Sequence, residues 1–297
     1  MSTISLPRSL SVILLAVSCA ALPSLAYADH SWGSYHWART SNPFALKLGD
    51  NLTSSDWKSK LAQASQDWNS PDTFSTTTPL LTAIVAGLPS LSKKRGSGSR
   101  VSSKSCSMVP GTTQVCNGSY GNNGWLGIAS INITGGTHIT QGTAKMNDSY
   151  FTTTKYNNPN EKLHVMCQEI AHTLGLDHQS TNGSSQNSCM DYFSNTGANA
   201  NSTISTTPNL HDFDQLNIIY GHLDSTTTLA AMAASTASAS DPTDDPKNWG
   251  QLKKQSKNGR SSIYEKHNGD GTETLTHVYW TEEAAANCPA CDHRHDH

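Results

Sequence analysis

"HVMCQEIAHTLGLDHQ", residues 164–179, is the stretch that decides how this sequence folds. A helix start signal precedes it, because Asn158 can serve as the N-cap and Pro159 suits the first helical position. Glu161 follows three residues after the cap, as in a capping box. Gly175 is expected to end the helix. Apolar residues between these signals repeat at helical spacing and predict a buried stripe: Leu163, Met166, Cys167, Ile170, Ala171 and Leu174.

Another face of the same helix carries polar side chains. Gln168 and His172 are four positions apart, so they lie one turn apart on one face, with Glu169 beside them. His178 follows three residues after Gly175. A glycine at that position lets the chain turn sharply, and a group from outside the helix can then join the polar face. The spacing therefore gathers polar groups at the end of the helix.

These residues resemble a known enzyme family. The segment QEIAHTLGLDH is similar to the metzincin zinc-protease motif HExxHxxGxxH at every defined position except the first, where Gln168 replaces histidine. Downstream, NSCMDYF places Met190 where that family has its methionine turn, and Tyr192 matches the Met-x-Tyr arrangement of the astacin and serralysin branches. The resemblance covers roughly residues 29–222. It implies an α+β fold with a mixed twisted sheet, an active-site helix and a methionine turn.

The resemblance also implies a set of roles. Gln168, His172 and His178 would surround a zinc ion, and Glu169 would be the general base. Tyr192 would stabilise the oxyanion or act as an additional ligand. The implied function is a zinc-dependent endopeptidase that hydrolyses peptide bonds through a metal-bound water activated by Glu169. Its partner would be a polypeptide substrate, and we expect a monomer.

Gln168 leaves a second interpretation open. Its amide oxygen has the reach to bind a metal, but a neutral amide donates less strongly than imidazole, so zinc affinity should fall. His164 lies one turn earlier, about 5.4 Å along the helix axis, which is too far to replace the missing histidine. We expect His164 beside the ligands or on the surface. The alternative function is a catalytically weak or inactive binding protein on the same fold.

The first residues predict export. Residues 1–28 combine Arg8, an apolar run and an Ala-Tyr-Ala end, which is typical of a signal peptide cleaved before Asp29. Lipidation at Cys19 is an alternative that fits the preceding residues less well. Removal of residues 1–28 changes the net charge from −3 to −4, because Arg8 is their only charged residue. This mild acidity argues against nucleic acid or membrane partners. We expect a secreted protein, extracellular or periplasmic.

Six cysteines remain after the signal peptide, and an even number in an exported protein predicts disulfides. Many pairings are possible, and pairing between neighbours is the simplest. A bridge between Cys167 and Cys189 would fasten the metal helix to the methionine turn. The neighbouring pairs are Cys106 with Cys116, Cys167 with Cys189, and Cys288 with Cys291.

Composition divides the chain after the signal peptide into three parts. Residues 29–224 form the metallopeptidase-like domain, and residues 225–247 form an Ala/Ser/Thr-rich linker. Residues 248–297 are expected to form a small C-terminal appendage, in which the turn at 268–271 joins two alternating runs into a hairpin. The Cys/His-rich tail would bind metal, or it would be a solvated end with a small disulfide loop. In a third interpretation, this tail binds metal while the helix site is silent.

Other segments of the main domain give shorter signals. GWLGIASINI, residues 124–133, predicts a strand, and by the resemblance it would bind extended substrate beside the cleft. Residues 87–123 are rich in Gly, Ser and Lys and predict a surface loop with a local disulfide. Residues 54–68 predict an amphipathic helix. His211 precedes apolar residues that predict a packing helix, and we expect it to serve in packing.

Overall fold

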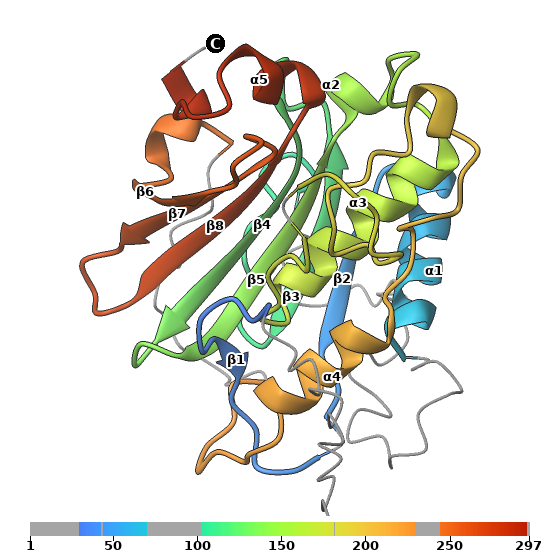
Figure 1. Ribbon diagram of the computed structural model, residues 1–297. Coiled ribbons are helices and arrows are strands. Elements are labelled where there is room, and N and C mark those ends of the chain that lie inside the picture. The colour runs from blue at the N-terminus through green and yellow to red at the C-terminus, as the bar shows by residue number, and fades with distance from the viewer. Residues whose placement is uncertain (1–29, 43, 70–101, 181, 230–243, 296–297) are drawn as a thin grey trace, which may run out of the picture.

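The chain folds into an α+β structure with a mixed sheet, which confirms that part of the expected fold (Figure 1). The expected signal peptide lies outside the described residues. Within the described part, no helix is long and apolar enough to cross a membrane. The computed structural model describes residues 30–42, 44–69, 102–180, 182–229 and 244–295.

The elements follow in chain order. The strands are β1 (His36–Trp37), β2 (Lys47–Asn51), β3 (Thr112–Gly118), β4 (Trp125–Thr134), β5 (His138–Asn147), β6 (Gln251–Gln255), β7 (Ser261–His267) and β8 (Glu273–Trp280). The helices are α1 (Ser55–Asn69), α2 (Asp148–Phe151), α3 (Pro159–His172), α4 (Leu210–Ile219) and α5 (Glu282–Asn287). Short 3₁₀ turns occur at Gly197–Asn199, Pro246–Asn248 and His293–His295.

One mixed sheet positions the helices. Its order is β2-β3-β5-β4-β8-β7-β6, and β1 pairs with β5 beside this path. β2, β3 and β5 are parallel to one another, whereas β4, β8, β7 and β6 continue the sheet in antiparallel pairs. Helix α3 packs on β4 and β5, and α1 packs beside α3 (Figure 1). The motif helix therefore lies across the middle of the sheet.

A buried strand replaces part of the expected loop. Residues 112–118 form β3, which is paired on both sides by β2 and β5, so the loop prediction is wrong there. Residues 87–101 lie outside the described part. The Gly- and Ser-rich composition indicated a loop, but two neighbouring strands satisfy the main-chain groups of this segment. Tertiary pairing therefore overrides its local preference.

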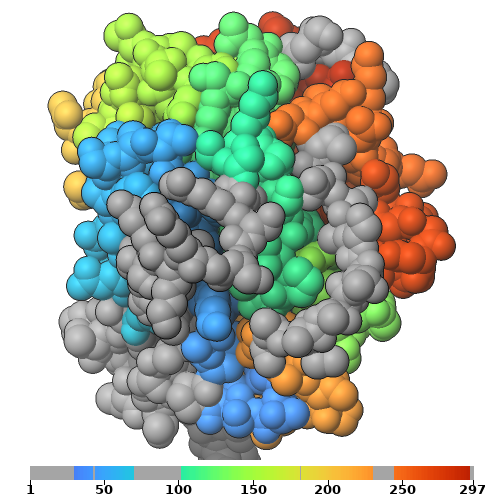
Figure 2. Space-filling model, turned by 180° about the vertical axis from the view of Figure 1, so that it is seen from behind, coloured from blue at the N-terminus to red at the C-terminus, as the bar shows by residue number. Residues whose placement is uncertain are grey.

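The predicted C-terminal hairpin forms, but it is not an appendage. β7 and β8 pair across the turn at 268–271, and β8 pairs with β4 from Trp125–Trp280 to Ile133–Glu273. From behind, the C-terminal residues in orange and red lie against the green central residues (Figure 2). Residues 251–280 thus extend the central sheet. The expected linker falls mostly on residues 230–243, outside the description.

The same pairing corrects the role expected for β4. We expected residues 124–133 to offer a free edge to an extended substrate, but β5 pairs with one side of this strand and β8 with the other. Its main-chain donors and acceptors are therefore already used by the chain itself. Strand addition to β4 requires β8 to leave first.

Two apolar clusters cover opposite faces of the sheet. The larger lies between the sheet and helices α1, α3 and α4, and it buries the predicted stripe of α1, including Trp57 and Trp68. The smaller cluster gathers Trp125, Trp249 and Trp280 on the other face. Alternation along β8 explains the division, because successive side chains point to opposite faces. Both clusters bury β8 in the fold.

Local signals set the limits of α3. The side chain of Asn158 accepts a hydrogen bond from the Glu161 backbone N–H (2.8 Å), which confirms the N-cap. The Glu161 carboxylate does not complete a capping box, because it accepts from the backbone N–H of Asn195 (2.6 Å). Gly175 has a φ of +93°, which L-residues other than glycine rarely adopt, and a Cβ there would overlap the carbonyl oxygen of Tyr35.

Disulfides join the pairs that neighbour pairing predicted. Cys106 bonds to Cys116 at β3, and Cys288 bonds to Cys291 after α5. Cys167 of α3 bonds to Cys189, which fastens the helix to the segment that carries Met190. The pairings are therefore confirmed. The terminal Cys-x-x-Cys is a disulfide, so these two sulfurs are not free to bind a metal.

Replacing Gly175 by alanine should cost far more stability than the same change at Gly136. Both glycines have positive φ, but the space around Gly136 is open within the described structure. Gly136→Ala should cost about 1 to 2 kcal/mol of backbone strain. Gly175→Ala must also displace Tyr35, so we expect a total above about 3 kcal/mol. Urea unfolding measures both, and equal losses would contradict the proposed clash.

Candidate metal centre

The end of α3 and the following turn present two histidines. The Nδ1 of His172 lies 2.8 Å from the carbonyl oxygen of Leu176, so its proton is on Nδ1 in the neutral ring. The Nδ1 of His178 lies 2.8 Å from the Tyr192 hydroxyl. Both Nε2 atoms are buried, and neither has a hydrogen-bond partner within the described structure. The Nε2 of His172 therefore presents a lone pair, and the Nε2 of His178 presents one when its Nδ1 carries the proton.

A third histidine comes from β8, which the sequence interpretation did not include in the site. His277 faces Ala129 of β4, and its ring stacks on that of His172, with centroids 3.7 Å apart. The His277 and His178 centroids are 4.7 Å apart. Neither ring nitrogen of His277 has a hydrogen-bond partner among the described residues. Nitrogen atoms of His172, His178 and His277 all lie within 4.8 Å of one another.

One sequence signal marks His277. It lies in the second alternating run of the predicted hairpin, between Leu275 and Tyr279, and these three residues share one face of β8. Leu275 and Tyr279 belong to the large apolar cluster. A histidine between two core residues on one strand face needs a buried partner, which makes it a candidate ligand. The pattern does not show which other histidines it meets.

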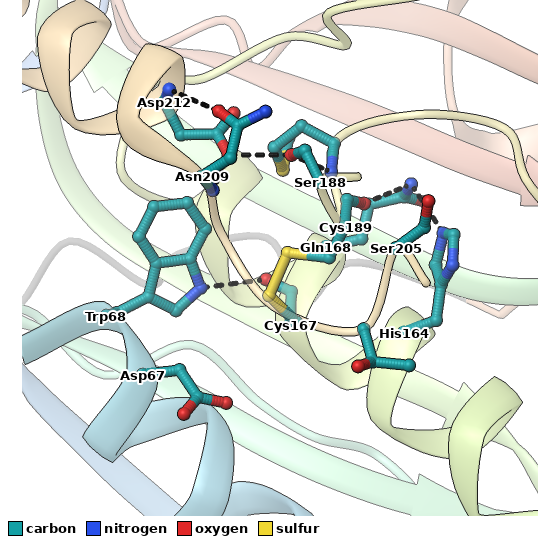
Figure 3. Close-up of a disulfide and its surroundings, with 12 residues drawn as sticks. Asp67, Trp68, His164, Cys167, Gln168, Ser188, Cys189, Ser205, Asn209 and Asp212 are labelled. Atoms are coloured by element: carbon teal, nitrogen blue, oxygen red, sulfur yellow. Dashed lines mark hydrogen bonds between the residues drawn. A yellow bond between two sulfur atoms is a disulfide. The ribbon is translucent and has the colours of Figure 1, made fainter. Parts of the chain in front are cut away.

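Gln168 is held by the turn that carries Met190 (Figure 3). Its Nε2 donates to the carbonyl oxygens of Cys189 (2.9 Å) and Asp191 (3.0 Å). It also lies 3.3 Å from Nε2 of His164, a buried ring and not a surface one. The Oε1 atom is buried and has no hydrogen-bond partner in the described structure. The amide therefore ties α3 to the turn, and only Oε1 remains for the expected role of metal ligand.

Glu169 lies on the sheet side of α3. Both of its carboxylate oxygens are buried, and the described residues offer them no hydrogen-bond partner. A Cβ at Gly127 of β4 would overlap Oε1, so the glycine makes room for this carboxylate. Burial raises the pKa of Glu169 well above its usual value, because the charged form loses its hydration. Among the described residues, this carboxylate is therefore buried without a hydrogen-bond partner.

Tyr192 orients His178. Its hydroxyl contacts the Nδ1 of His178 and the hydroxyl of Ser261, which places it behind the imidazole. Asp177 accepts from the backbone N–H of His178 (2.8 Å) and pairs with Lys254 (2.5 Å). Such hydrogen bonds to the second nitrogen fix the orientation of a metal-binding histidine. The structure thus puts Tyr192 behind one of the expected ligands.

Burial keeps the three imidazoles neutral. It lowers the pKa of His172 to about 3, with a further lowering from the neighbouring His178. It also lowers the pKa of His178, and it lowers that of His277 well below the ordinary value with the help of both neighbours. Neutral imidazole is the form that binds metal ions. The electrostatics therefore suit a divalent cation among these rings.

The remaining predicted residues have structural positions. Met190 is fully buried in the large cluster, and its carbonyl accepts from the Gln179 backbone N–H (2.7 Å). His211 stacks on His30 in the first turn of α4, as the packing interpretation expected. In the tail, the ring of His293 packs against Trp280 with centroids 5.2 Å apart. Packing therefore accounts for these three residues.

The donor set fits a zinc ion. Three neutral imidazoles with unpaired nitrogens, two of them oriented by hydrogen bonds on the opposite nitrogen, are a common zinc environment. The Glu169 carboxylate, which has no hydrogen-bond partner among the described residues, lies on the same helix as His172. No family model matches this chain, and no curated protein or solved structure matches it either. The site's own geometry therefore carries the functional argument.

A cleft of about 910 Å³ lies next to the histidines, and Tyr192, whose hydroxyl contacts His178, is one of its lining residues. Charged residues from three segments line it, and Arg260 lies 3.6 Å from Glu282. Tyr192 separates the cleft from His178, because its hydroxyl contacts that ring. The lining residues are Thr154, Lys155, Asn158, Gly183, Tyr192, Phe193, Ser194, Thr196, Gly197, Asn199, Ala200, Asn258, Arg260 and Glu282.

Replacing Gln168 by leucine distinguishes a structural role of this side chain from a role as a metal ligand. The change leaves two buried carbonyls without their donor, so the free energy of unfolding should fall by about 3 kcal/mol. Gln63→Leu on the exposed face of α1 is the matched control, with an expected change below about 0.5 kcal/mol. Zinc content should be retained in both variants. Loss of zinc from Gln168→Leu at unchanged stability would show that Oε1 is a ligand.

Proposed function

We propose that this chain is a secreted zinc-dependent peptidase of metzincin-like fold, with His172, His178 and His277 as the zinc ligands. Glu169 is the general base. Six cysteines joined in three disulfides support export to an oxidising environment, extracellular or periplasmic. The α+β fold, the motif helix and the buried methionine turn support the metzincin-like assignment.

One observation carries this proposal. The Nε2 atoms of His172 and His178 and both nitrogens of His277 are buried without a hydrogen-bond partner, and the same holds for the Glu169 carboxylate, within the described residues. Unpaired buried polar atoms normally cost about 1 to 3 kcal/mol each, so proteins avoid gathering them. A bound cation would offset that cost. The motif then needs no histidine at position 168, because β8 supplies the third imidazole.

The residues define a mechanism for peptide hydrolysis. A zinc ion held by the three imidazoles would act as a Lewis acid toward water and the substrate carbonyl. Glu169 takes a proton from the attacking water and passes it to the leaving amine. Tyr192 holds the His178 ring through Nδ1, and Asp177 holds the adjacent backbone. Their role is to keep the ring aimed at the site.

The cleft beside Tyr192 is the proposed path for a polypeptide substrate. β8 occupies the edge of β4, so the substrate does not bind there as an added strand. The cleft offers side chains of both charges, including Lys155 and Glu282, and backbone from the methionine-turn segment. Movement of Tyr192 would connect it to the histidines. The proposal therefore assigns substrate binding to the cleft.

A zinc-binding protein without catalysis is the second candidate. The ligand histidines and Glu169 are all buried, with His178 the most exposed at 7%. A closed site favours stable metal binding over turnover. Both candidates need the same ligands, and they differ only in whether Glu169 acts on a substrate.

Exchanging Glu169 for glutamine tests catalysis. The amide has nearly the same shape but cannot accept a proton from water, so peptide cleavage should fall by a factor of about 100 or more. Zinc content should stay unchanged. Cleavage of a quenched fluorescent peptide library and zinc analysis of the same samples measure both. A wild-type protein that binds zinc and cleaves no peptide would support the binding-protein candidate instead.

Exchanging His277 for alanine tests the third ligand. The variant should lose one zinc ion per chain after dialysis, together with any peptidase activity, because two imidazoles bind zinc weakly. His267→Ala is the matched control, since it lies on the same hairpin with its side chain 71% exposed. It should keep both zinc and activity. Unchanged zinc content in His277→Ala would remove His277 from the ligand set.

A further inference from the structure

A second group of histidines lies away from the candidate centre. His36 in β1, His138 at the start of β5, and His222 after α4 all point at Asp224. Their Nε2 atoms lie 3.2, 3.3 and 3.7 Å, respectively, from Oδ1 of Asp224. The Nε2 atoms of His36 and His222 are 3.2 Å apart. His138 approaches Asp224, and the donor atoms of His36, His222 and Asp224 all lie within 4.8 Å of one another.

These distances match a tetrahedral zinc site. Zinc binds imidazole nitrogen and carboxylate oxygen at about 2.0 to 2.2 Å, and tetrahedral ligands at that radius are about 3.3 to 3.5 Å from one another. The three separations among the donor atoms of His36, His222 and Asp224 are 3.2, 3.7 and 3.2 Å. These three residues therefore have the mutual spacing of ligands that share one cation.

Neighbouring groups orient the donors. The Nδ1 of His36 lies 2.8 Å from the carbonyl oxygen of Ser34, which leaves a lone pair on Nε2 in the neutral ring. The other oxygen of Asp224 accepts from the backbone N–H (3.0 Å) and the Nη1 (3.2 Å) of Arg39. Oδ1 is therefore the oxygen that faces the three rings. Without a proton or a cation between them, the His36 lone pair and Oδ1 repel each other.

Access to this cluster differs from that of the candidate centre. The side chain of Asp224 is only 9% exposed, whereas those of His138 and His222 are 33% and 52% exposed. A cation can enter from solvent and still find two buried ligands. Arg39 places one positive charge beside the carboxylate, which lowers the attraction of Asp224 for a cation, so binding also depends on the imidazole donors.

We propose that His36, His222 and Asp224 bind a second divalent cation of the zinc class, with His138 beside Asp224. It ties the N-terminal segment to the chain after α4. Nitrogen donors with one carboxylate and a tetrahedral spacing favour Zn²⁺ over Ca²⁺ or Mg²⁺, which take oxygen ligands. The role is structural, because Asp224 is the only carboxylate of this group and Arg39 holds it. The inference does not depend on peptidase activity.

Zinc counting tests this site. The full chain should retain two zinc ions after dialysis against zinc-free buffer, and His222→Ala should retain one. His138→Ala removes an imidazole next to the ligand group and is the matched control, which should retain two. Because His138 and His222 are partly exposed, both variants are expected to fold, and far-ultraviolet circular dichroism checks this. Their peptidase activity, where the wild type has it, should be unchanged.

The outcomes separate the two centres. His277→Ala should lose the ion of the candidate centre and keep the second ion, and a His222→Ala/His277→Ala double variant should retain neither. A single zinc lost in His222→Ala but not in His277→Ala supports the second site and contradicts the proposed function. Zinc content that is the same in wild type and His222→Ala overturns the second site. Thermal unfolding gives an independent reading, because added zinc should raise the Tm of wild type more than that of His222→Ala.

Discussion

The main-chain pairing of β8 with β4 is the constraint on which the candidate centre depends. It runs from Trp125–Trp280 to Ile133–Glu273 and holds His277 opposite Ala129. At that register the ring stacks on His172, which belongs to a helix packed across β4 and β5. A shift by one residue would send His277 to the opposite face, because side chains alternate along a strand. The sheet register therefore determines whether three imidazoles meet.

That pairing also explains how glutamine is tolerated at position 168. The amide nitrogen of Gln168 donates to two carbonyl oxygens of the methionine-turn segment, next to the disulfide between Cys167 and Cys189 (Figure 3). A histidine has one N–H in its neutral form and would leave one of those carbonyls unpaired. The position that resembles a ligand site thus has a bracing role here. In the proposed ligand set, His277 of the sheet takes the place of the ligand expected at position 168 of the helix.

Local features could be predicted from the sequence, and contacts between distant segments could not. Asn158 as N-cap, Gly175 as the turn and the hairpin at 268–271 each depend on residues within a few positions. β3 was missed because its stability comes from β2 and β5, not from its Gly- and Ser-rich surroundings. The role of His277 was missed for the same reason. Its alternating run predicts a strand but not the partner strand.

The order in which a chain is made gives the position of His277 a consequence for timing. His172 and His178 are synthesised well before β8, so a nascent chain carries the motif helix without the third imidazole. The proposed zinc site is therefore incomplete until β8 has been synthesised and has paired with β4. Under the proposed function, hydrolysis cannot begin before that step.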